Sequence, residues 1–266
     1  MGLDALAIAA IVVLLLGFPD RARQLMNEAL RRAKHIDSQY ILGLVHIRGA
    51  MLCGLLGDGR AVLEHAQELR HLSANQPAWA GIADMDTGKA LMIQSEWEEG
   101  VRYLRKGVAF HKALGLASQP IWAELYEAEF FTNQGQVDDG LALIGKALTD
   151  SEELLQIRSP ALRQRADLLA LSNADTSAVD AAYRAAIECA RSQGAKYYEL
   201  QATTRFARWL KSQRRFEEAR TILAAIYNWF AEGFDTVALK EAKALLDELS
   251  NKPSAPRRSS RPRKGR

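Results

Sequence analysis

Apolar residues recur along most of this chain at intervals of three and four positions, the period of a helix that is buried on one face. The stretches AELYEAEFFTNQ (123–134) and LALIGKALTDSEELL (141–155) show this period, and a polar turn, GQVDDG, separates them. No stretch alternates apolar and polar residues as a half-buried strand would. The pattern therefore predicts an all-α protein built from helix-turn-helix pairs.

The polar turns repeat at a nearly constant interval. Six segments share the form of a polar or glycine-rich turn that leads into a helix, namely GFPDRA, GDGRAV, SEWEEG, GQVDDG, ADTSAV and RRFEEA. They end at residues 22, 62, 100, 140, 179 and 219, so successive copies lie 38 to 40 residues apart, and the fifth copy is the weakest. A constant period of this kind is the signature of a solenoid, in which each unit stacks on its neighbours.

Small residues mark where two helices meet. Seven positions separate Gly100 from Gly107, and also Gly140 from Ala147. Seven residues make about two helical turns, so both members of a pair face the same neighbour and allow it to approach closely. This signature resembles the tetratricopeptide repeat, whose usual period is about 34 residues, whereas HEAT-like pairs have periods near 40 but lack it. We therefore predict a right-handed superhelical solenoid of about six tetratricopeptide-like repeats over residues 1–250, with lengthened helices or connectors.

Prolines and a glycine predict several helix boundaries. Pro77, Pro120 and Pro160 lie between repeats, each at the expected entrance to a first helix, where a missing backbone donor costs little. Gly233 is expected to stop the second helix of the sixth unit near residue 231, and Asp235 is expected to cap the helix that follows.

That last helix carries one apolar stripe and is interpreted as a C-terminal capping helix, because the sixth unit would otherwise expose its apolar face. The aromatic cluster YNWF (227–230) is interpreted as packing within this last layer, in preference to a ligand pocket.

The N-terminal stretch LAIAAIVVLLLGF (6–18) is apolar nearly all round. It is shorter than the roughly 20 residues that span a membrane, no Lys or Arg precedes it, and no small-residue cleavage pattern follows it, so we expect neither an anchor nor a signal peptide. The repeat register makes it the first helix of the first unit. We expect its outer face to be covered by a second copy of the chain or by an upstream region, the alternative being a frayed and partly exposed terminus.

The segment YNWFAEGFDTVALKEAKALLDEL (227–249) resembles the C-terminal repeat region of large bacterial signalling proteins, as do the preceding ARWLKSQRRFEEARTILAAIY and AAYRAAIECARSQGAKYYELQATTRFA. In those proteins a class III adenylate or guanylate cyclase domain is followed by a P-loop ATPase and then by tetratricopeptide-like repeats. LLGFPDRARQLMNEALRRAKHI and LLGDGRAVLEHAQELRHLSANQ resemble the early repeats of that region. The resemblance implies a regulatory or protein-interaction module, and no cyclase activity, because the metal-binding aspartates and the phosphate loop of those proteins lie upstream of their repeats.

Other candidate chemistry is weak. In GIADMDTGKA (81–90), six residues rather than four separate the glycines, Lys89 is followed by alanine, and no strand precedes. Glu64, Glu68 and His71 share one helical face, but such a group without a matching one from another helix is a poor metal site. No Gly-x-Ser-x-Gly elbow, zinc-binding cysteine pairs or recognisable histidine triad is found. We therefore expect no enzyme activity, cofactor or metal.

Composition and charge complete the picture. With 48% hydrophobic and 25% charged residues, the 266-residue chain is typical of a folded soluble protein. Its two cysteines, Cys53 and Cys189, are too few for a disulfide framework, which suits the cytoplasm. The net charge of +3 is uneven, because residues 251–266 carry seven Lys and Arg and no acid, leaving 28 basic and 32 acidic side chains elsewhere. We expect this tail to be disordered.

Two functions fit these features. The favoured one is a protein-interaction or sensory module, in which the curved surface of the solenoid binds a protein or peptide through first-helix side chains. Trp79, Trp122 and Arg205 are the candidates, although for each of them burial in the stack is favoured over contact with a partner, most clearly for the tryptophans. The alternative is weak, salt-sensitive nucleic-acid binding through the basic tail. Repeats that read RNA need matched polar pairs at fixed positions, and none is found.

Overall fold

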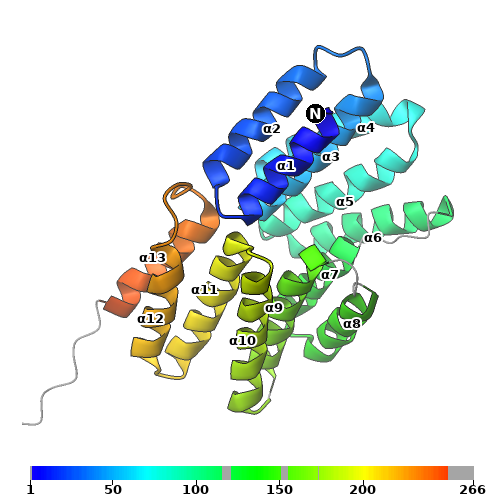
Figure 1. Cartoon of the computed structure of the whole chain (residues 1–266). Helices are drawn as coiled ribbons and strands as arrows, with labels where there is room; N and C mark the ends of the chain where they lie inside the picture. The colour runs from blue at the N-terminus through cyan, green and yellow to red at the C-terminus, as the bar shows by residue number, and fades with distance from the viewer. Residues whose placement is uncertain (1, 116–120, 151–154, 173, 251–266) are drawn as a thin grey trace, which may run out of the picture.

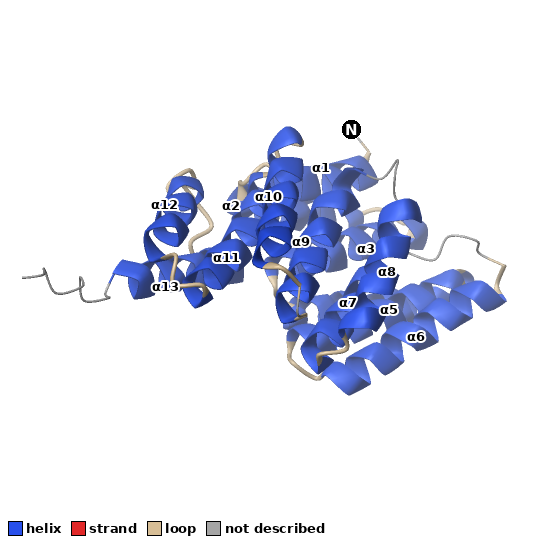
Figure 2. Cartoon of the chain, turned by 90° about the horizontal axis from the view of Figure 1, so that it is seen from below, coloured by secondary structure: helices blue, strands red, loops and turns tan. Residues whose placement is uncertain are grey.

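The computed structural model describes residues 2–115, 121–150, 155–172 and 174–250, and this part of the chain is helical with short connections (Figure 2). Its α-helices form six successive pairs followed by one further helix, which confirms the predicted solenoid with a C-terminal capping helix. The helices are α1 (Leu3–Leu15), α2 (Pro19–Ala33), α3 (Gln39–Leu56), α4 (Gly59–His71), α5 (Ala78–Ile93), α6 (Trp97–Ala113), α7 (Ile121–Gln134), α8 (Val137–Asp150), α9 (Leu155–Leu171), α10 (Thr176–Ser192), α11 (Lys196–Ser212), α12 (Phe216–Tyr227) and α13 (Val237–Ser250). The predicted basic tail lies outside the described residues.

In five of the six units, the turn between the two helices uses one residue in the left-handed conformation. Glycine fills this position in three units, with φ of 99° at Gly17, 77° at Gly57 and 69° at Gly135. Ser95 and Arg214 take the same conformation in the third and sixth units, with φ of 69° and 61°. Residues other than glycine adopt it at a cost, so the repeated geometry is imposed by the packing of the two helices as well as by the turn residue.

Glycines allow α5 and α6 to touch backbone to backbone. A Cβ atom added to Gly107 would lie 2.4 Å from the carbonyl oxygen of Gly81, and one added to Gly88 would lie 2.5 Å from that of Gly100. Real Cβ atoms do not approach so closely, because the backbone cannot move aside cheaply. The predicted role of the Gly100 and Gly107 pair is therefore confirmed in this unit.

α3 is an inner helix of the second unit. It has 18 residues and a mean hydropathy of 1.4, so by length and composition it could cross a membrane. In the structure it packs against α1, α2, α4 and α5, and its apolar side chains serve contacts between units.

Two predicted boundaries near the C-terminus are wrong. α12 ends at Tyr227, and an irregular segment follows, so Gly233 (φ 76°) lies beyond the helix end that it was expected to form. α13 is capped by Thr236, whose Oγ1 accepts a hydrogen bond from the Leu239 backbone N–H at 3.4 Å. Asp235 instead accepts a hydrogen bond from Arg23 at 2.8 Å. Both differences arise because this segment contacts the first unit, and the local sequence pattern does not predict that contact.

The prolines behave differently from one another. Pro77 directly precedes α5, as predicted. Pro160 lies inside α9, which begins five residues earlier, so the prediction of a helix entrance there is wrong. A proline in this position removes one backbone hydrogen bond of the helix, and packing on both sides of α9 compensates for that loss. Pro120 lies outside the described residues.

The first and last units are in contact, so the solenoid closes on itself (Figure 1). The Trp229 ring covers Gly17, where an added Cβ would lie 2.4 Å from ring atom Cζ3. Pro19 covers Gly233 in the same way, at 2.5 Å. One hydrophobic core, which we call the terminal core, runs from Ala7 in α1 to Leu249 in α13. The aromatic cluster at the C-terminus therefore packs the last unit against the first.

Hydrogen bonds reinforce this contact between residues 17–23 and 228–236, which we call the clasp. Glu232 Oε1 accepts the backbone N–H groups of Asp20 and Arg21, each at 3.1 Å. Phe18, at the N-cap position of α2, has no side-chain cap, so a residue more than 200 positions away supplies it. In return, Asp20 Oδ2 accepts the Gly233 N–H at 3.1 Å.

The N-terminal helix is covered on one side, mainly by its neighbours α2 and α3, with a smaller contact to α11. Ala7, Ala10, Ile11 and Leu14 of α1 are buried in the terminal core. Ile8, Val12 and Leu16 remain exposed on its other side. Packing within the chain thus buries one face of the apolar stretch, and the outer face stays open in the monomer.

Candidate ligand-binding groove

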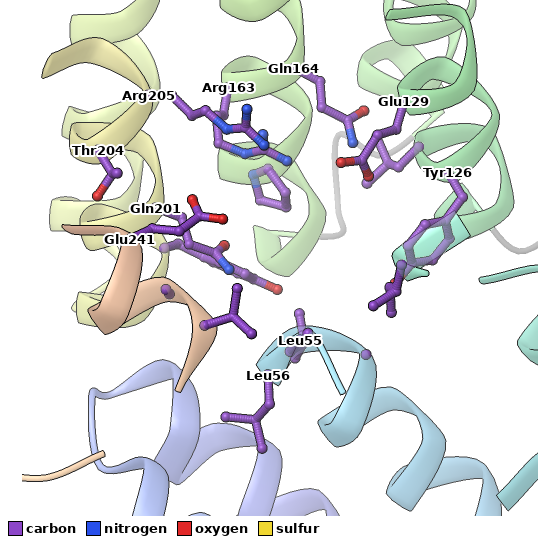
Figure 3. Close-up of a pocket in the computed structure, with 18 of the residues that line it drawn as sticks. Leu55, Leu56, Tyr126, Glu129, Arg163, Gln164, Gln201, Thr204, Arg205 and Glu241 are labelled. Carbon is purple, nitrogen blue, oxygen red and sulfur yellow. The ribbon is translucent and has the colours of Figure 1, made fainter. Parts of the chain in front are cut away.

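First helices of successive units line the inner surface of the solenoid, and two cavities open there. One, of about 240 Å³, lies where α7, α9 and α11 meet the start of α13 and the turn between α3 and α4 (Figure 3). The other, of about 410 Å³, follows α7, α9 and α11. Four residues line both cavities, namely Glu129, Arg163, Gln164 and Arg205. The two cavities therefore form one continuous site, which we call the inner groove.

Closure of the solenoid builds one wall of the smaller cavity. Leu55, Leu56 and Gly57 reach it from the second unit, and Val237 reaches it from the capping helix. The second unit and the capping helix touch here, since a Cβ added to Gly57 would lie 3.1 Å from Cγ2 of Val237. Trp122 adds an aromatic surface from α7. An open solenoid, in which the second unit and the capping helix stood apart, would lack this enclosed apolar end.

Arg205 contributes a positive charge to the groove. Its exposed guanidinium points into the cavity from α11 (Figure 3) and makes no hydrogen bond or ion pair with the part of the chain that the structure describes. Partial desolvation acts to lower the pKa of Arg205, but the negative charges of Asp167, Glu129 and Glu241 together raise it. The side chain is therefore a firmly charged cation with free hydrogen-bond donors.

Most other charged groups in the groove are already paired. Arg163 forms an ion pair with Asp167 at 2.9 Å, and Glu241 accepts a hydrogen bond from Arg208 at 3.3 Å. Glu129 has no hydrogen bond or ion pair among the described residues. The groove thus presents one unpaired anion, Glu129 on α7, and one unpaired cation on α11.

Three polar atoms that are buried without a partner also belong to groove-lining residues. They are Oε1 of Gln164, the hydroxyl oxygen of Tyr198 and Nε of Arg163. The side chains of Gln164 and Tyr198 are only 5% and 3% exposed. Burial raises the pKa of Tyr198, so its hydroxyl stays neutral and able to donate. A buried polar group without a partner costs about 1–3 kcal/mol, so a polar ligand that reaches these groups is stabilised.

The structure brings together two of the three predicted site residues. Trp122 and Arg205 both line the inner groove. Trp79 lies elsewhere, buried in α5 against Gly43 and stacked on Tyr40 with ring centroids 5.7 Å apart. Its environment is that of a core tryptophan.

Sequence reasoning missed Glu129, Gln164 and Tyr198. A signal for the groove exists on α11, where Gln201, Thr204 and Arg205 occupy one face of a helix that is otherwise largely buried. A stripe of polar residues on a helix usually faces solvent, which requires the helix to lie on the outside of the stack. On a helix that is buried inside the stack, the same stripe indicates that the helix lines a cavity.

The weak chemical motifs have structural roles. GIADMDTGKA lies within the continuous helix α5, and Nζ of Lys89 donates a hydrogen bond to the Ala50 carbonyl oxygen at 3.1 Å and pairs with Asp86 at 2.8 Å. No phosphate loop is formed there. Within the described ranges, no group of three His, Cys, Asp or Glu side chains is placed to hold a metal ion. Burial raises the pKa of Cys53 to about 11, as expected for a cysteine that packs as a hydrophobe.

Comparison with known proteins identifies the fold. No protein-family model matches the sequence, and no curated protein matches it. A crystal structure of a Rap protein complexed with Competence and Sporulation Factor is similar with a TM-score of 0.61 at 15% identity, covering 93% of this chain and 70% of that one. The apo form of the quorum sensor NprR from B. thuringiensis is similar with a TM-score of 0.51 at 15% identity, covering 92% and 79%. At this identity, the similarity shows a shared tetratricopeptide-like solenoid.

Proposed function

We propose that this chain is a regulatory module that binds an extended peptide, or a segment of a partner protein, in its inner groove. The observation that carries the proposal is the convergence of unpartnered polar groups on one partly apolar groove. An extended peptide offers backbone donors and acceptors along its length, together with side chains for an apolar end. An extended peptide therefore matches the groove better than a small apolar molecule does.

Two similarities support a role in bacterial signalling. One structure with this fold contains a bound factor, and the other is described as a quorum sensor. The sequence resemblance to the repeat region of cyclase–ATPase proteins adds a candidate partner, namely a cyclase–ATPase encoded nearby. Reading the adjacent coding sequence tests this part: a phosphate loop and cyclase aspartates would support it, and their absence would remove it.

The exposed face of α1 supports a second contact, made by another copy of this chain. Ile8 and Val12 are one helical turn apart on that face, and both are exposed. We expect Ile8→Glu combined with Val12→Glu to abolish concentration-dependent dimerisation in sedimentation experiments. A wild-type chain that stays monomeric at high concentration would refute this contact. The alternative of nucleic-acid binding depends on residues 251–266, which lie outside the described part of the chain.

Peptide binding is tested by selection from a random library displayed on phage, with the full chain immobilised. Recovered peptides are resynthesised with a fluorescent label and titrated by fluorescence anisotropy. We expect Gln164→Leu to weaken binding about tenfold, because it removes a buried hydrogen-bonding group at nearly constant volume. Arg220→Gln is the control, since Arg220 pairs with Glu217 on α12 and does not line the groove. Recovery of no peptide, or equal affinity for the wild type and Gln164→Leu, would contradict the proposal.

A further inference from the structure

We infer that the inner groove selects a dipolar segment, with a cationic group bound at Glu129 and an acidic group bound at Arg205. This inference rests on the proposed function and gives its ligand a charge pattern. The two side chains come from different helices, α7 and α11, and point into the same cavity (Figure 3). The ligand is therefore bound in one direction.

The balance of charge excludes a strongly anionic or cationic ligand as the best fit. The groove is lined by three arginines and three carboxylates, namely Arg163, Arg205, Arg208, Glu129, Asp167 and Glu241. A polyanion would meet three carboxylates, and a polycation would meet three guanidinium groups, so either would face repulsion inside the groove. A segment with one charge of each sign pairs with both unpaired groups and adds no net charge.

The existing ion pairs explain why only two positions are free. Asp167 holds Arg163, and Arg208 donates to Glu241, so a ligand that bound these groups would have to break a protein contact. Arg205 and Glu129 lose no ion pair when a ligand arrives. Hydrogen bonds between ionised groups are about twice as strong as neutral ones, so these two contacts would dominate selectivity.

The size of the cavity limits how far apart the ligand charges lie. Glu129 and Arg205 both line the cavity of about 240 Å³. An extended peptide advances about 3.3 Å per residue, so two or three residues bridge a site of this size. Gln164, on α9, lines the same cavity, and its buried amide oxygen has no hydrogen-bond partner among the described residues. A small rotation of this amide would bring the oxygen within reach of a backbone N–H of the bridging residues. Trp122 and Leu125 receive an apolar side chain at the same point.

Defined pools of blocked hexapeptides test the charge pattern. Five pools carry Lys-x-x-Glu, Glu-x-x-Lys, Lys-x-x-Gln, Gln-x-x-Glu or Gln-x-x-Gln at their centre, with acetylated and amidated ends. Each pool is incubated with the full chain, and retained peptides are quantified by mass spectrometry. We expect one dipolar order to be retained at least fivefold better than its reverse and than each singly charged or neutral pool.

Near-isosteric variants assign each charge to its residue. Glu129→Gln should remove the advantage of Lys and keep that of Glu, and Arg205→Gln should do the reverse. The double variant Glu129→Arg with Arg205→Glu should invert the preferred order. Arg220→Gln, on the outer surface, should change nothing, and circular dichroism with thermal melting establishes that every variant is folded.

The outcomes separate this inference from the proposal beneath it. If the neutral pool is retained as well as the dipolar pools, the groove binds peptides but the charge pattern is wrong. The pattern is also wrong if a preferred order survives in both single variants. If no pool is retained by the folded wild-type chain, peptide binding and the charge pattern both fail.

Discussion

The two ends of this chain share one continuous core, whereas its middle is held together by small separate clusters. The terminal core joins residues of α1 to α3 with residues of α9 to α13. In the middle, by contrast, one cluster consists of Met85, Leu104 and Ala123, and another of Leu69, Trp79 and Ala83. In an open solenoid each unit touches only its neighbours, and its ends are the least supported parts. Here closure gives the two end units one shared hydrophobic core.

The middle units depend on a different kind of contact. α5 and α6 approach through glycines, so backbone rather than large side chains forms much of their interface. Such an interface is rigid and tolerates little added volume. The ends meet through Trp229 and the side chains of the terminal core, and their hydrogen bonds join residues more than 200 positions apart. The comparison shows that the extent of the contact between two units does not follow from how close they are in the sequence.

The largest expected effect comes from paired leucine truncations. Leu14 in the terminal core is 0% exposed and Leu104 in the middle is 1% exposed, so Leu14→Ala and Leu104→Ala remove the same buried group. Each should lower the free energy of unfolding by about 2–5 kcal/mol. Hydrogen exchange should then differ: Leu14→Ala should reduce protection in α1, α2 and α11 to α13, and Leu104→Ala only in α5 to α7. Identical exchange patterns in the two variants would show that the ends and the middle of the chain do not differ in how their units are connected.

The glycine contact in the middle predicts the next largest effect. Gly107→Ala places a methyl group 2.4 Å from the Gly81 carbonyl oxygen, so it should destabilise the protein by about 1–3 kcal/mol in urea unfolding. Gly145→Ala is the matched control, because Gly145 lies within α8 and has no atom within 4 Å of an added Cβ. That substitution should stabilise the protein by about 0.5–1 kcal/mol. A neutral Gly107→Ala would show that α5 and α6 are not in backbone contact.

A smaller effect is expected at the clasp. Glu232→Ala removes the acceptor for the Asp20 and Arg21 backbone N–H groups, so it should cost about 0.5–2 kcal/mol, the usual range for a lost N-cap. Glu217→Ala is the control, an exposed acid on α12 outside the clasp. Small-angle scattering should detect a larger radius of gyration for Glu232→Ala if the solenoid opens. Equal stability of the two variants would mean that the clasp adds nothing beyond the terminal core.

The smallest effect concerns the exposed pair of Arg23 and Asp235. Arg23→Ala should cost about 0.2–1 kcal/mol, and less at high salt. The hydrogen bond from Arg23 lowers the pKa of Asp235 below its ordinary value of 3.8. Stability from this carboxylate is therefore complete above about pH 4 and is lost as pH falls through the lowered pKa. The wild type and Arg23→Ala should converge in stability in acid, and an unchanged difference at pH 2 would contradict the pairing.

Sequence reasoning located part of the candidate site. Trp122 and Arg205 line the groove, whereas Trp79, a first-helix tryptophan like Trp122, is buried among core residues. The sequence could not separate the two tryptophans, because both occupy the same kind of position in a repeat. Gln164 and Tyr198 were missed because whether a buried polar atom finds a partner depends on atoms from other helices.

What the sequence determined by itself was local: the helical period, the turns near every fortieth residue and the small residues that let paired helices touch. These features depend on hydrogen bonds and contacts within a few turns of the chain. Only the tertiary structure decided that Glu232 caps α2, that Trp229 covers Gly17 and that the second unit meets α13 to enclose the groove. Those contacts join residues about 180 or more positions apart, and they depend on the small rotations between units summed over the whole solenoid.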